Sequence, residues 1–390
     1  MPQSTDLIYL DHQATTPVDP IVLDAMLPFF SGDFGNASSH HLAGRRAALA
    51  VDDARDSVGA LIDGRPSGVV FTSGATEANN LVLQGAAGYE VGRPNVVVCR
   101  TEHLSVLDTV AAMAKSGTEL TLVDVDTDGR INLDDLRAKV TTRTALVSVM
   151  LANNEIGTVA PVAEIADIAH ASGALFHCDA TQGVGRLPIS VRASEIDFLT
   201  LSAHKLYGPK GVGAVHVSRR GQAVIEPIIH GGGHERGLRS GTLNVPGVVG
   251  LGRACEVAGS VLGVEEPELE RLAGRLHAGV MGVGDVILNG PISDRLPGNR
   301  SYCFGGVDGE DLLLRMPQLA ASTGSACSSA SPAPSHVLLA IGRSYDEALS
   351  ALRFGVGRFT TEQEIDRAVI LVTDAVRAAR SESLPARNAS

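Results

Sequence analysis

The chain has 390 residues, of which 44% are hydrophobic and 19% are charged, a composition typical of a globular protein with a large buried core. Its formal net charge of −12 disfavours direct nucleic-acid binding, because binders of the phosphate backbone normally present a basic face. No apolar run reaches the ~18–20 residues of a membrane span, and the first residues lack the order of a secretion signal. We therefore expect a cytoplasmic protein with no membrane partner.

Short apolar runs alternate with helix-like segments from about residue 66 onward. The runs are "GVVFT", "NVVVCR", "ALVSVML", "ALFHCDA", "DFLTLSAH" and "GAVHVS". Amphipathic segments such as "TEANNLVLQGAAGY" and "VAEIADIAHASG" lie between them, and the second ends in a glycine at the helix C-cap. Continuous apolar strands separated by helices predict an α/β fold with a mostly parallel sheet covered on both faces.

The pattern changes in the second half of the chain. A glycine-rich basic segment, "IIHGGGHERGLRSGT", is followed by a long helical stretch over roughly 246–282. The segments "DVILNG" and "NRSYCFGG" and a final amphipathic helix then predict a smaller α+β domain. We expect a large domain over 15–256, and a small domain made of 1–14 and 257–390.

Five cysteines lie far apart, at positions 99, 178, 255, 303 and 327, without a C-x-x-C pair. This spacing indicates neither a disulfide framework nor a zinc site. Cys99 and Cys178 belong to apolar runs and are expected to be small buried residues. Cys327 instead lies in "ASTGSACSSASPAPS", among small and turn-forming residues. We expect a mobile loop over about 321–334.

Polar residues follow the predicted strands, and ligands of such sheets bind beyond the carboxyl ends of the strands. A helix N-terminus with hydroxyl side chains follows "GVVFT" and forms either an anion cradle or an ordinary N-cap. Lys205 is the one lysine of four that follows a strand. The residues at the ends of these runs or shortly after them are Ser73, Gly74, Ala75, Thr76, His103, Asn153, Asn154, Asp179, Ser202, His204 and Lys205.

These groups together match the needs of pyridoxal phosphate. A lysine forms a Schiff base with the aldehyde of the cofactor, an acid keeps the pyridine nitrogen protonated, and the cradle holds the phosphate. We expect no metal site. The glycines between His230 and His234 disfavour a helical i,i+4 pair, and no cysteine lies near these residues or near His40/His41 in the sequence.

The sequence resembles the cysteine desulfurases of the NifS/IscS type, which belong to the fold-type I, class-V aminotransferase-like enzymes. The motifs that carry the resemblance span nearly the whole chain: "YLDHQATTPVDP", "GNASS", "FTSGATEANN", "TEHLSVLDT", "NNEIGT", "DATQGVG", "SAHKLYGPKG", "GGGHERGLRSGT", "TGSACSSASPAPSHVLLAIG" and "LRFGVGRFTT". The resemblance implies a pyridoxal-phosphate-dependent transferase with a large sheet domain and a smaller α+β domain.

The resemblance also implies roles for single residues. Lys205 would bind the cofactor covalently and shuttle protons, while His103 would stack on the pyridine ring and assist proton transfer. Asp179 would pair with the pyridine nitrogen, and Gln182 would donate to the phenolic oxygen. The residues expected at the phosphate are Ala75, Thr76, Ser202 and His204, joined by Thr242 from the partner subunit of a homodimer.

The substrate carboxylate would be held by Asn154 and by Arg353, the latter through a bidentate fork. Arg353 also fits a helix-surface charge, and Arg358 is a weaker candidate for the same role. The family commonly has an aromatic residue where this chain has His12, which we expect beside the substrate entrance.

The implied reaction converts L-cysteine to L-alanine and leaves a persulfide on Cys327 for a sulfur acceptor. The acceptor would be a protein, such as an iron–sulfur scaffold or a thio-modification enzyme acting on nucleic acid. Three alternatives stay open: a selenocysteine lyase or an aminotransferase on the same scaffold, and a scaffold subunit without catalytic activity.

Overall fold

The computed structural model describes residues 7–87, 92–323 and 333–383. Its strands are β1 (Ile8–Tyr9), β2 (Val69–Thr72), β3 (Asn95–Cys99), β4 (Glu119–Val123), β5 (Thr144–Ser148), β6 (Leu175–Asp179), β7 (Phe198–Ser202), β8 (Gly213–Val217), β9 (Val286–Asn289), β10 (Asn299–Phe304), β11 (Leu319–Ala320), β12 (Ser322–Thr323) and β13 (Ala351–Gly355).

The α-helices of the same residues run between and after these strands. They are α1 (Pro20–Met26), α2 (Pro28–Ser31), α3 (Leu42–Leu61), α4 (Ala75–Ala87), α5 (Leu104–Ala114), α6 (Leu133–Lys139), α7 (Val162–Ala171), α8 (Arg219–Gln222), α9 (Val245–Val261), α10 (Glu265–Met281), α11 (Gly309–Arg315), α12 (His336–Ala340), α13 (Tyr345–Leu349) and α14 (Glu362–Ser383).

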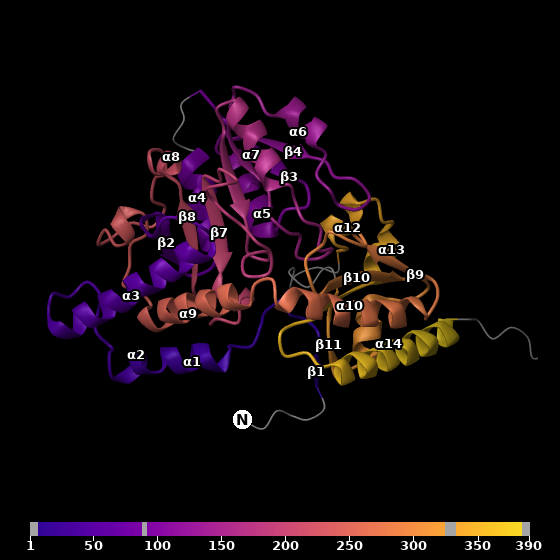
Figure 1. The fold of residues 1–390 in the computed structure, drawn as a ribbon. Coiled ribbons are helices and arrows are strands. Elements are labelled where there is room, and N and C mark those ends of the chain that lie inside the picture. Colours follow the sequence, from indigo (N-terminus) through magenta and orange to yellow (C-terminus); the bar gives the residue numbers. More distant parts are fainter. Residues whose placement is uncertain (1–6, 88–91, 324–332, 384–390) are drawn as a thin grey trace, which may run out of the picture.

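The large sheet of the described chain has seven strands in the order β2-β8-β7-β6-β5-β3-β4 (Figure 1). β7, β6, β5, β3 and β4 are parallel to one another, whereas β8 is antiparallel to both of its neighbours. The prediction of a mostly parallel sheet is therefore confirmed. Each of the six apolar runs forms a strand of this sheet.

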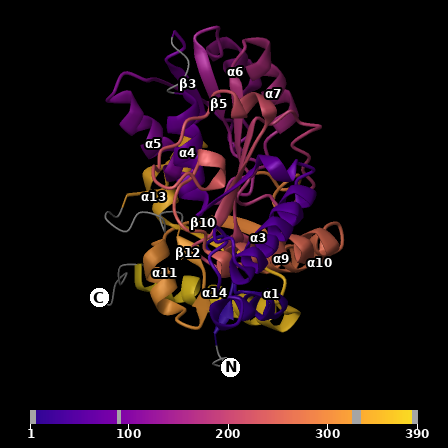
Figure 2. The same cartoon turned by 90° about the vertical axis from the view of Figure 1, so that its left-hand side faces the viewer.

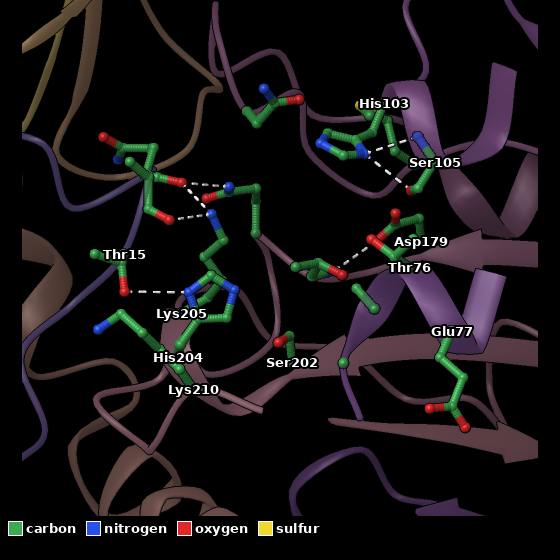
Figure 3. A pocket seen from close by; sticks show the side chains of 18 of the residues that line it. Thr15, Thr76, Glu77, His103, Ser105, Asp179, Ser202, His204, Lys205 and Lys210 are labelled. Atoms are coloured by element: carbon green, nitrogen blue, oxygen red, sulfur yellow. Dashed lines mark hydrogen bonds between the residues drawn. The ribbon is translucent and has the colours of Figure 1, made fainter. Parts of the chain in front are cut away.

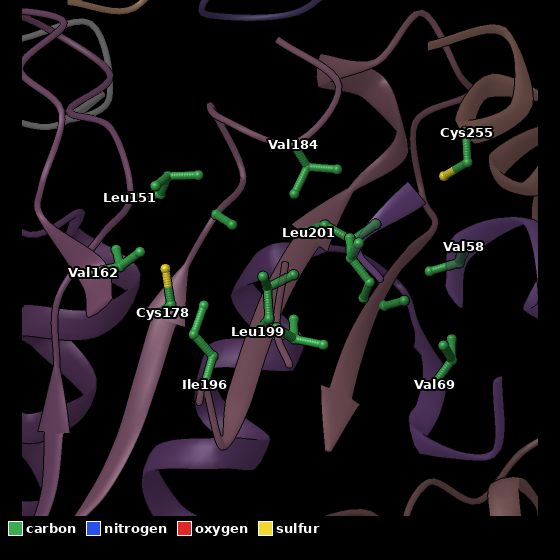
Figure 4. Close-up of a cluster of buried hydrophobic side chains, with 14 of the residues drawn as sticks. Val58, Val69, Leu151, Val162, Cys178, Val184, Ile196, Leu199, Leu201 and Cys255 are labelled. Atoms are coloured by element: carbon green, nitrogen blue, oxygen red, sulfur yellow. The ribbon is translucent and has the colours of Figure 1, made fainter. Parts of the chain in front are cut away.

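Helices cover both faces of the large sheet. Successive side chains of each strand point to opposite faces, so each strand contributes to two separate hydrophobic clusters. Val69 and Phe71 of β2 pack in one hydrophobic cluster, which includes residues of α3 and α9, while Val70 packs in another, which includes α4 and α5. Figure 2 shows the two helix pairs on opposite sides of the sheet. The cluster beside α9 contains Cys178 (Figure 4), so its predicted burial is confirmed, as is that of Cys99.

A second sheet, of four antiparallel strands in the order β12-β13-β10-β9, belongs to the C-terminal part of the described chain. α10 and α14 pack on it through a separate cluster that also contains Ile8 and Leu10 from the N-terminal segment. β1 pairs with β11 in parallel. These contacts agree with an N-terminal segment that joins the C-terminal elements, while the domain boundaries at 15 and 256 stay a prediction.

The expected helix over 246–282 is two helices rather than one. α9 ends at Val261 and α10 begins at Glu265, and their axes are bent by 81°. Gly263 has φ +79, a conformation that favours glycine, and Glu265, Glu266 and Glu268 occupy the first turn of α10. Acidic side chains stabilise a helix N-terminus through the helix dipole, so these residues favour the start of a second helix at Glu265.

In the described part of the chain, no single helix is long and apolar enough to cross a membrane. Helices α9 and α10 reach the length and apolar composition of a membrane span only when they are combined, and the pair is bent. The described residues also contain no group of three or more His, Cys, Asp or Glu side chains that could hold a metal ion.

Candidate active site

A cavity of about 590 Å³ lies at the carboxyl edge of the large sheet (Figure 3). Its walls come from the strand ends, from the N-terminal segment and from β13. The lining residues are Gln13, Ala14, Thr15, Ser73, Gly74, Ala75, Thr76, Glu77, His103, Ser105, Met150, Ala152, Asn154, Asp179, Thr181, Gln182, Ser202, His204, Lys205, Lys210, Gly211 and Arg353.

One end of the cavity is the N-terminus of α4. The first N–H groups of a helix have no acceptor within the helix, so they attract anions. Glu77 in the first turn accepts a hydrogen bond from the backbone N–H of Ser73 (2.9 Å) and a two-point ion pair from Arg239 (2.8 and 3.3 Å). Because Arg239 compensates the charge of Glu77, the turn keeps its attraction for a phosphate.

Asp179 ends β6 and is buried at the cavity wall. One carboxylate oxygen accepts a hydrogen bond from Nδ2 of Asn79 (2.8 Å), and the other accepts one from the backbone N–H of Thr181 (3.0 Å). A donor on each oxygen fixes the position of the carboxylate. The site therefore offers a fixed negative charge to a protonated ring nitrogen.

His103 is the N-cap of α5 and lies across the cavity from the turn that carries Lys205 (Figure 3). Its Nδ1 accepts a hydrogen bond from the backbone N–H of Ser105 (3.0 Å) and lies 2.9 Å from the Ser105 hydroxyl. Burial lowers the pKa of His103, the charge of Asp179 opposes this effect, and the charge of Lys205 adds to it. The net shift favours the neutral ring.

Lys205 lies in the turn after β7, and its amine points toward the N-terminal segment. It donates to the carbonyl oxygens of Gln13 and Ala14, the latter at 2.8 Å. The amide of Gln182 also donates to the carbonyl of Gln13 (2.9 Å). The N-terminal segment thus orients both side chains, although it lies almost two hundred residues away in the sequence.

His204 and Lys210 complete the rim beside Lys205. His204 Nδ1 lies 3.2 Å from the hydroxyl of Thr15. Burial lowers the pKa of His204 to about 4, helped by the charges of Lys205 and Lys210. Lys210 lies in the turn between β7 and β8 and lines the cavity too, although it does not directly follow a strand.

Arg353 of β13 forms the opposite wall and is only 4% exposed. Its guanidinium donates to the carboxylate of Asp11 (2.8 Å) and to the carbonyl of Asn154 (3.1 Å), while its buried Nε has no hydrogen-bond partner among the described residues. Arg358 instead lies outside this cavity and pairs with Asp19 and Glu265. The structure favours Arg353 over Arg358 as the group facing a ligand.

The donor set fits pyridoxal phosphate on three observations. The cavity has an amine, a fixed carboxylate and a helix N-terminus on one sheet edge. The hydroxyl of Thr181 is buried at the wall and has no partner among the described residues. A Cβ built on Gly74 would have only the hydroxyl oxygen of Ser202 within 4 Å, at 3.9 Å, so the cradle leaves open space.

Two of the residues expected at or near the site do not line this cavity, and a third is not among the described residues. Thr242 is exposed and lines no part of it, whereas Cys327 lies outside the described residues. His12 is only 3% exposed, with its Nδ1 2.8 Å from the carbonyl of Gly355, so its expected place beside the entrance is wrong. His12 lies in a turn and packs inward beside Gly355 and Tyr207, while the carboxylate of the preceding residue, Asp11, contacts Arg353.

Sequence reasoning missed several residues that the structure brings to the site. Asp11, Gln13 and Ala14 belong to a quoted motif, but only the tertiary contact with Arg353 or Lys205 gives them a place. Asn79 lies inside the quoted "FTSGATEANN", one helical turn after the cradle. Its polar side chain on a buried helix face was the signal that could have identified it.

The fold and the site together define a pyridoxal-phosphate-dependent enzyme of fold type I. The family model described as "Aminotransferase class-V" matches residues 8–368. The chain therefore belongs to the class-V aminotransferase family, whose members depend on this cofactor.

The chain is also similar to individual members of this family. It is 49% identical over 379 residues to a protein named cysteine desulfurase IscS from Anaeromyxobacter sp. (strain Fw109-5), covering 96% of this chain and 94% of the relative. A solved NifS-like protein aligns with a TM-score of 0.90 at 35% identity, covering 95% and 100% of the two chains. A structure titled "SspA in complex with cysteine" aligns with a TM-score of 0.80 at 32% identity, covering 90% and 99%.

Proposed function

We propose that the protein is a pyridoxal-phosphate-dependent cysteine desulfurase, which converts L-cysteine to L-alanine and transfers the sulfur to one of its own thiols. One observation carries the proposal: Lys205, Asp179, His103 and Arg353 line a single cavity beside a helix N-terminus. The similarity to a named cysteine desulfurase over 96% of the chain supports the choice of reaction.

The bound cofactor supplies an aldehyde that reacts with amines and a ring that withdraws electrons from the substrate. The backbone of Ala75 and Thr76, together with Ser202 and His204, binds its phosphate. Asp179 keeps the proton on the ring nitrogen. Gln182 uses one amide hydrogen for the carbonyl of Gln13, and its second remains for the phenolic oxygen, since a carboxamide has two.

Lys205 moves the substrate proton. Its amine lies in the cavity, where the carbonyl groups of Gln13 and Ala14 orient it. As a free base it takes the proton from the Cα of the substrate and returns a proton to the carbon that loses sulfur. His103 lines the same cavity and would pack against the cofactor when it is bound and assist this transfer.

Arg353 and Asn154 bind the substrate carboxylate. The Nε of Arg353 is the part of the guanidinium left without a partner among the described residues, because its two other nitrogens contact Asp11 and Asn154. A carboxylate at this edge therefore completes the hydrogen bonds of a buried cation. This contact aligns the Cα–H bond toward Lys205.

Cys327 accepts the sulfur, a role supported by its motif rather than by the described coordinates. Its thiolate attacks the substrate sulfur, so that an S–S bond forms as the Cβ–S bond breaks. The carbon gains a proton and leaves as alanine, and Cys327 becomes a persulfide. A thiol with an ordinary pKa near ~8.5 is mostly protonated at pH 7, so the attack requires a site that favours the thiolate.

The test is to add pyridoxal phosphate and L-cysteine to the purified protein and measure alanine, sulfide and pyruvate. We expect the cofactor to bind with a visible absorption band, and alanine and sulfide to form in equal amounts when a thiol reductant is present. Protein that binds no cofactor would support the scaffold alternative. Transfer of the amino group to a keto acid without sulfide would support the aminotransferase alternative.

Replacement of Cys327 tests the covalent step separately. We expect Cys327→Ser to retain the absorption band and to lose sulfide formation by about 100-fold or more, and Cys303→Ser serves as the control at a buried thiol. Full alanine production by Cys327→Ser would refute the persulfide. A higher turnover of selenocysteine than of cysteine by this variant would favour the selenocysteine lyase.

We further propose that the protein is a homodimer in which Thr242 binds the phosphate in the partner subunit. Two observations support this arrangement: Thr242 is exposed and absent from the cavity of its own chain, and Phe30 and Phe34 are exposed apolar residues. Light scattering should give twice the mass of one chain. Mixed dimers of Lys205→Ala and Thr242→Ala chains should contain one intact site and recover up to half of the activity.

The proposed sulfur acceptor is a protein, either an iron–sulfur scaffold or a thio-modification enzyme, and the proposed location is the cytoplasm, which keeps thiols reduced. The negative net charge of −12 favours protein partners with basic surfaces. Capture of partners on the persulfidated protein, compared with Cys327→Ser, would identify the acceptor.

A further inference from the structure

Asn79 lies behind the cavity wall and connects two groups of the site. It is on α4 and is fully buried. Its Nδ2 donates to Oδ2 of Asp179 (2.8 Å) and to the hydroxyl oxygen of Ser105 (2.9 Å). The Ser105 hydroxyl in turn lies 2.9 Å from Nδ1 of His103. One amide therefore joins the acid and the histidine of the site.

The direction of each hydrogen bond in this series, from Asp179 to His103, follows from the chemistry of the groups. An amide nitrogen only donates, so Asp179 and Ser105 both accept from Asn79. The hydroxyl hydrogen of Ser105 is then free to point at His103, whose Nδ1 also accepts the backbone N–H of Ser105 (3.0 Å). Two donors converge on Nδ1, so the proton of the neutral imidazole lies on Nε2.

The opposite orientation of the amide is excluded by charge. Turning Asn79 would place its carbonyl oxygen against the carboxylate of Asp179, and neither of these oxygens can donate a hydrogen bond. In the observed orientation Oδ1 of Asn79 is buried and has no partner among the described residues. A buried acceptor without a donor is costly, and the two donated bonds offset that cost.

We propose that Asn79 is a positioning residue that fixes the position of the Asp179 carboxylate and, through Ser105, the Nδ1-acceptor form of His103. The inference rests on the proposed function, because it assigns these two groups to the ring of pyridoxal phosphate. One amide thereby places a negative charge at one position of the ring and a neutral imidazole at another. Burial lowers the pKa of His103 in agreement with this form.

The decisive variant is Asn79→Asp, which has nearly the same size but loses both donated hydrogen bonds. Its carboxylate faces Asp179 and accepts the Ser105 hydroxyl hydrogen, which His103 then loses. We expect the Kd for pyridoxal phosphate, measured by absorbance titration, to rise about ten- to hundredfold, as for the loss of a hydrogen bond to a charged group.

The second readout is the protonation form of His103, which does not depend on turnover. In ¹⁵N spectra of the histidine-labelled protein, with and without cofactor, the Nδ1 signal should change from acceptor-like toward N–H-like in Asn79→Asp. The signal is assigned by its loss in His103→Gln. The same spectra recorded against pH should give a higher midpoint for His103 in the variant than in the wild type.

Three matched variants separate positioning from a general effect on stability. Asn80→Ala removes the neighbouring amide of the same helix, which bonds to the carbonyl of Thr76 (2.9 Å) and not to Asp179, so neither readout should change. Ser105→Ala should shift the His103 signal while changing the Kd less than threefold. Ser105→Thr keeps the hydroxyl and should restore the His103 signal.

The outcomes are distinguishable from failure of the proposed function. Wild-type protein that binds no pyridoxal phosphate would refute that function, whereas binding by the wild type and an equal Kd for Asn79→Asp would refute only the role of Asn79. If Asn79→Asp changed only the Kd or only the His103 signal, the role of Asn79 would also be refuted, because this one residue is proposed to set both. If circular dichroism shows Asn79→Asp unfolded, an unshifted His103 signal in Ser105→Ala overturns the link.

Discussion

The cavity has two walls that are built in different ways. The sheet wall consists of His103, Asp179 and Lys205, each of which ends or closely follows a strand of the large sheet. The arginine wall consists of Asn154 and Arg353, with Asp11 paired to Arg353 outside the cavity lining, and these three residues come from distant parts of the chain. The sheet wall follows from the order of strands, whereas the arginine wall exists only because the N-terminal segment and β13 pack together.

The difference also concerns charge. On the sheet wall the carboxylate of Asp179 receives neutral donors only, so its full charge is available to a ligand. On the arginine wall the cation of Arg353 is already paired with Asp11, so a ligand carboxylate meets a partly compensated charge. We therefore expect mutations of the sheet wall to affect turnover, and those of the arginine wall to affect substrate affinity.

The largest effect should come from Lys205→Ala. The variant loses the group that moves the proton, so we expect the rate of alanine formation to fall about 10³-fold or more. Steady-state kinetics with added pyridoxal phosphate measures this loss. Lys115→Ala, at the C-cap of α5, is the control and should retain wild-type kinetics. If Lys205→Ala kept a tenth of the activity, the sheet wall would not be the catalytic one.

Glu155 adjoins the arginine wall and predicts a dependence of stability on pH. It is buried, accepts a hydrogen bond from the Ser335 hydroxyl (2.5 Å), and burial raises its pKa from 4.5 to about 7. Between these pH values the folded chain binds more protons than the unfolded chain at this residue, so this group lowers the free energy of unfolding as pH rises. The decrease is about 3 kcal/mol by pH 8.

We expect Glu155→Gln to remove this decrease, so that the variant exceeds the wild type by up to about 3 kcal/mol at pH 8 and by much less at pH 5. Urea unfolding at both pH values measures the difference. The matched control is Glu164→Gln on the exposed side of α7, which should follow the wild type. Equal offsets at pH 5 and pH 8 would contradict the assigned cause.

Arg353→Lys should weaken substrate binding without a large effect on the chemical step. A lysine cannot form the two-point contact of a guanidinium with a carboxylate, so we expect KM for L-cysteine to rise about ten- to hundredfold with kcat changed only a few-fold. The control is Arg358→Lys, which alters the pairs with Asp19 and Glu265. The Tm of that variant should be lower than that of the wild type, and its KM should be unchanged. If Arg358→Lys raised KM and Arg353→Lys did not, Arg358 would be the residue that binds the substrate.

The smallest effects should come from Asp11. Asp11→Asn keeps an acceptor for Arg353 but removes its charge, so the guanidinium attracts the substrate more strongly and KM should fall about two- to fivefold. Asp11→Ala removes the acceptor as well, and the loss of orientation should raise KM instead. Initial rates over a range of cysteine concentrations distinguish these directions. Identical KM values for both variants would show that Asp11 does not act on Arg353.

Much of the fold was predictable because its signals are local. A run of apolar residues such as Asn95–Cys99 is buried on both faces, and that burial is visible in the sequence. β4 (Glu119–Val123) escaped notice because it is an edge strand whose first residues are exposed, so its polarity resembles that of a loop. The break at Gly263 was missed because apolar and helix-forming residues continue on both sides of it.

The candidate site divides in the same way. The sequence by itself determined the sheet wall, since parallel strands bring their carboxyl ends to one edge whatever the loops do. Only the tertiary structure decided that Arg353 rather than Arg358 faces the cavity, that Lys210 joins the rim, and that His12 packs inward. Those choices depend on contacts between segments far apart in the chain, and no local pattern of residue types encodes which surfaces will meet.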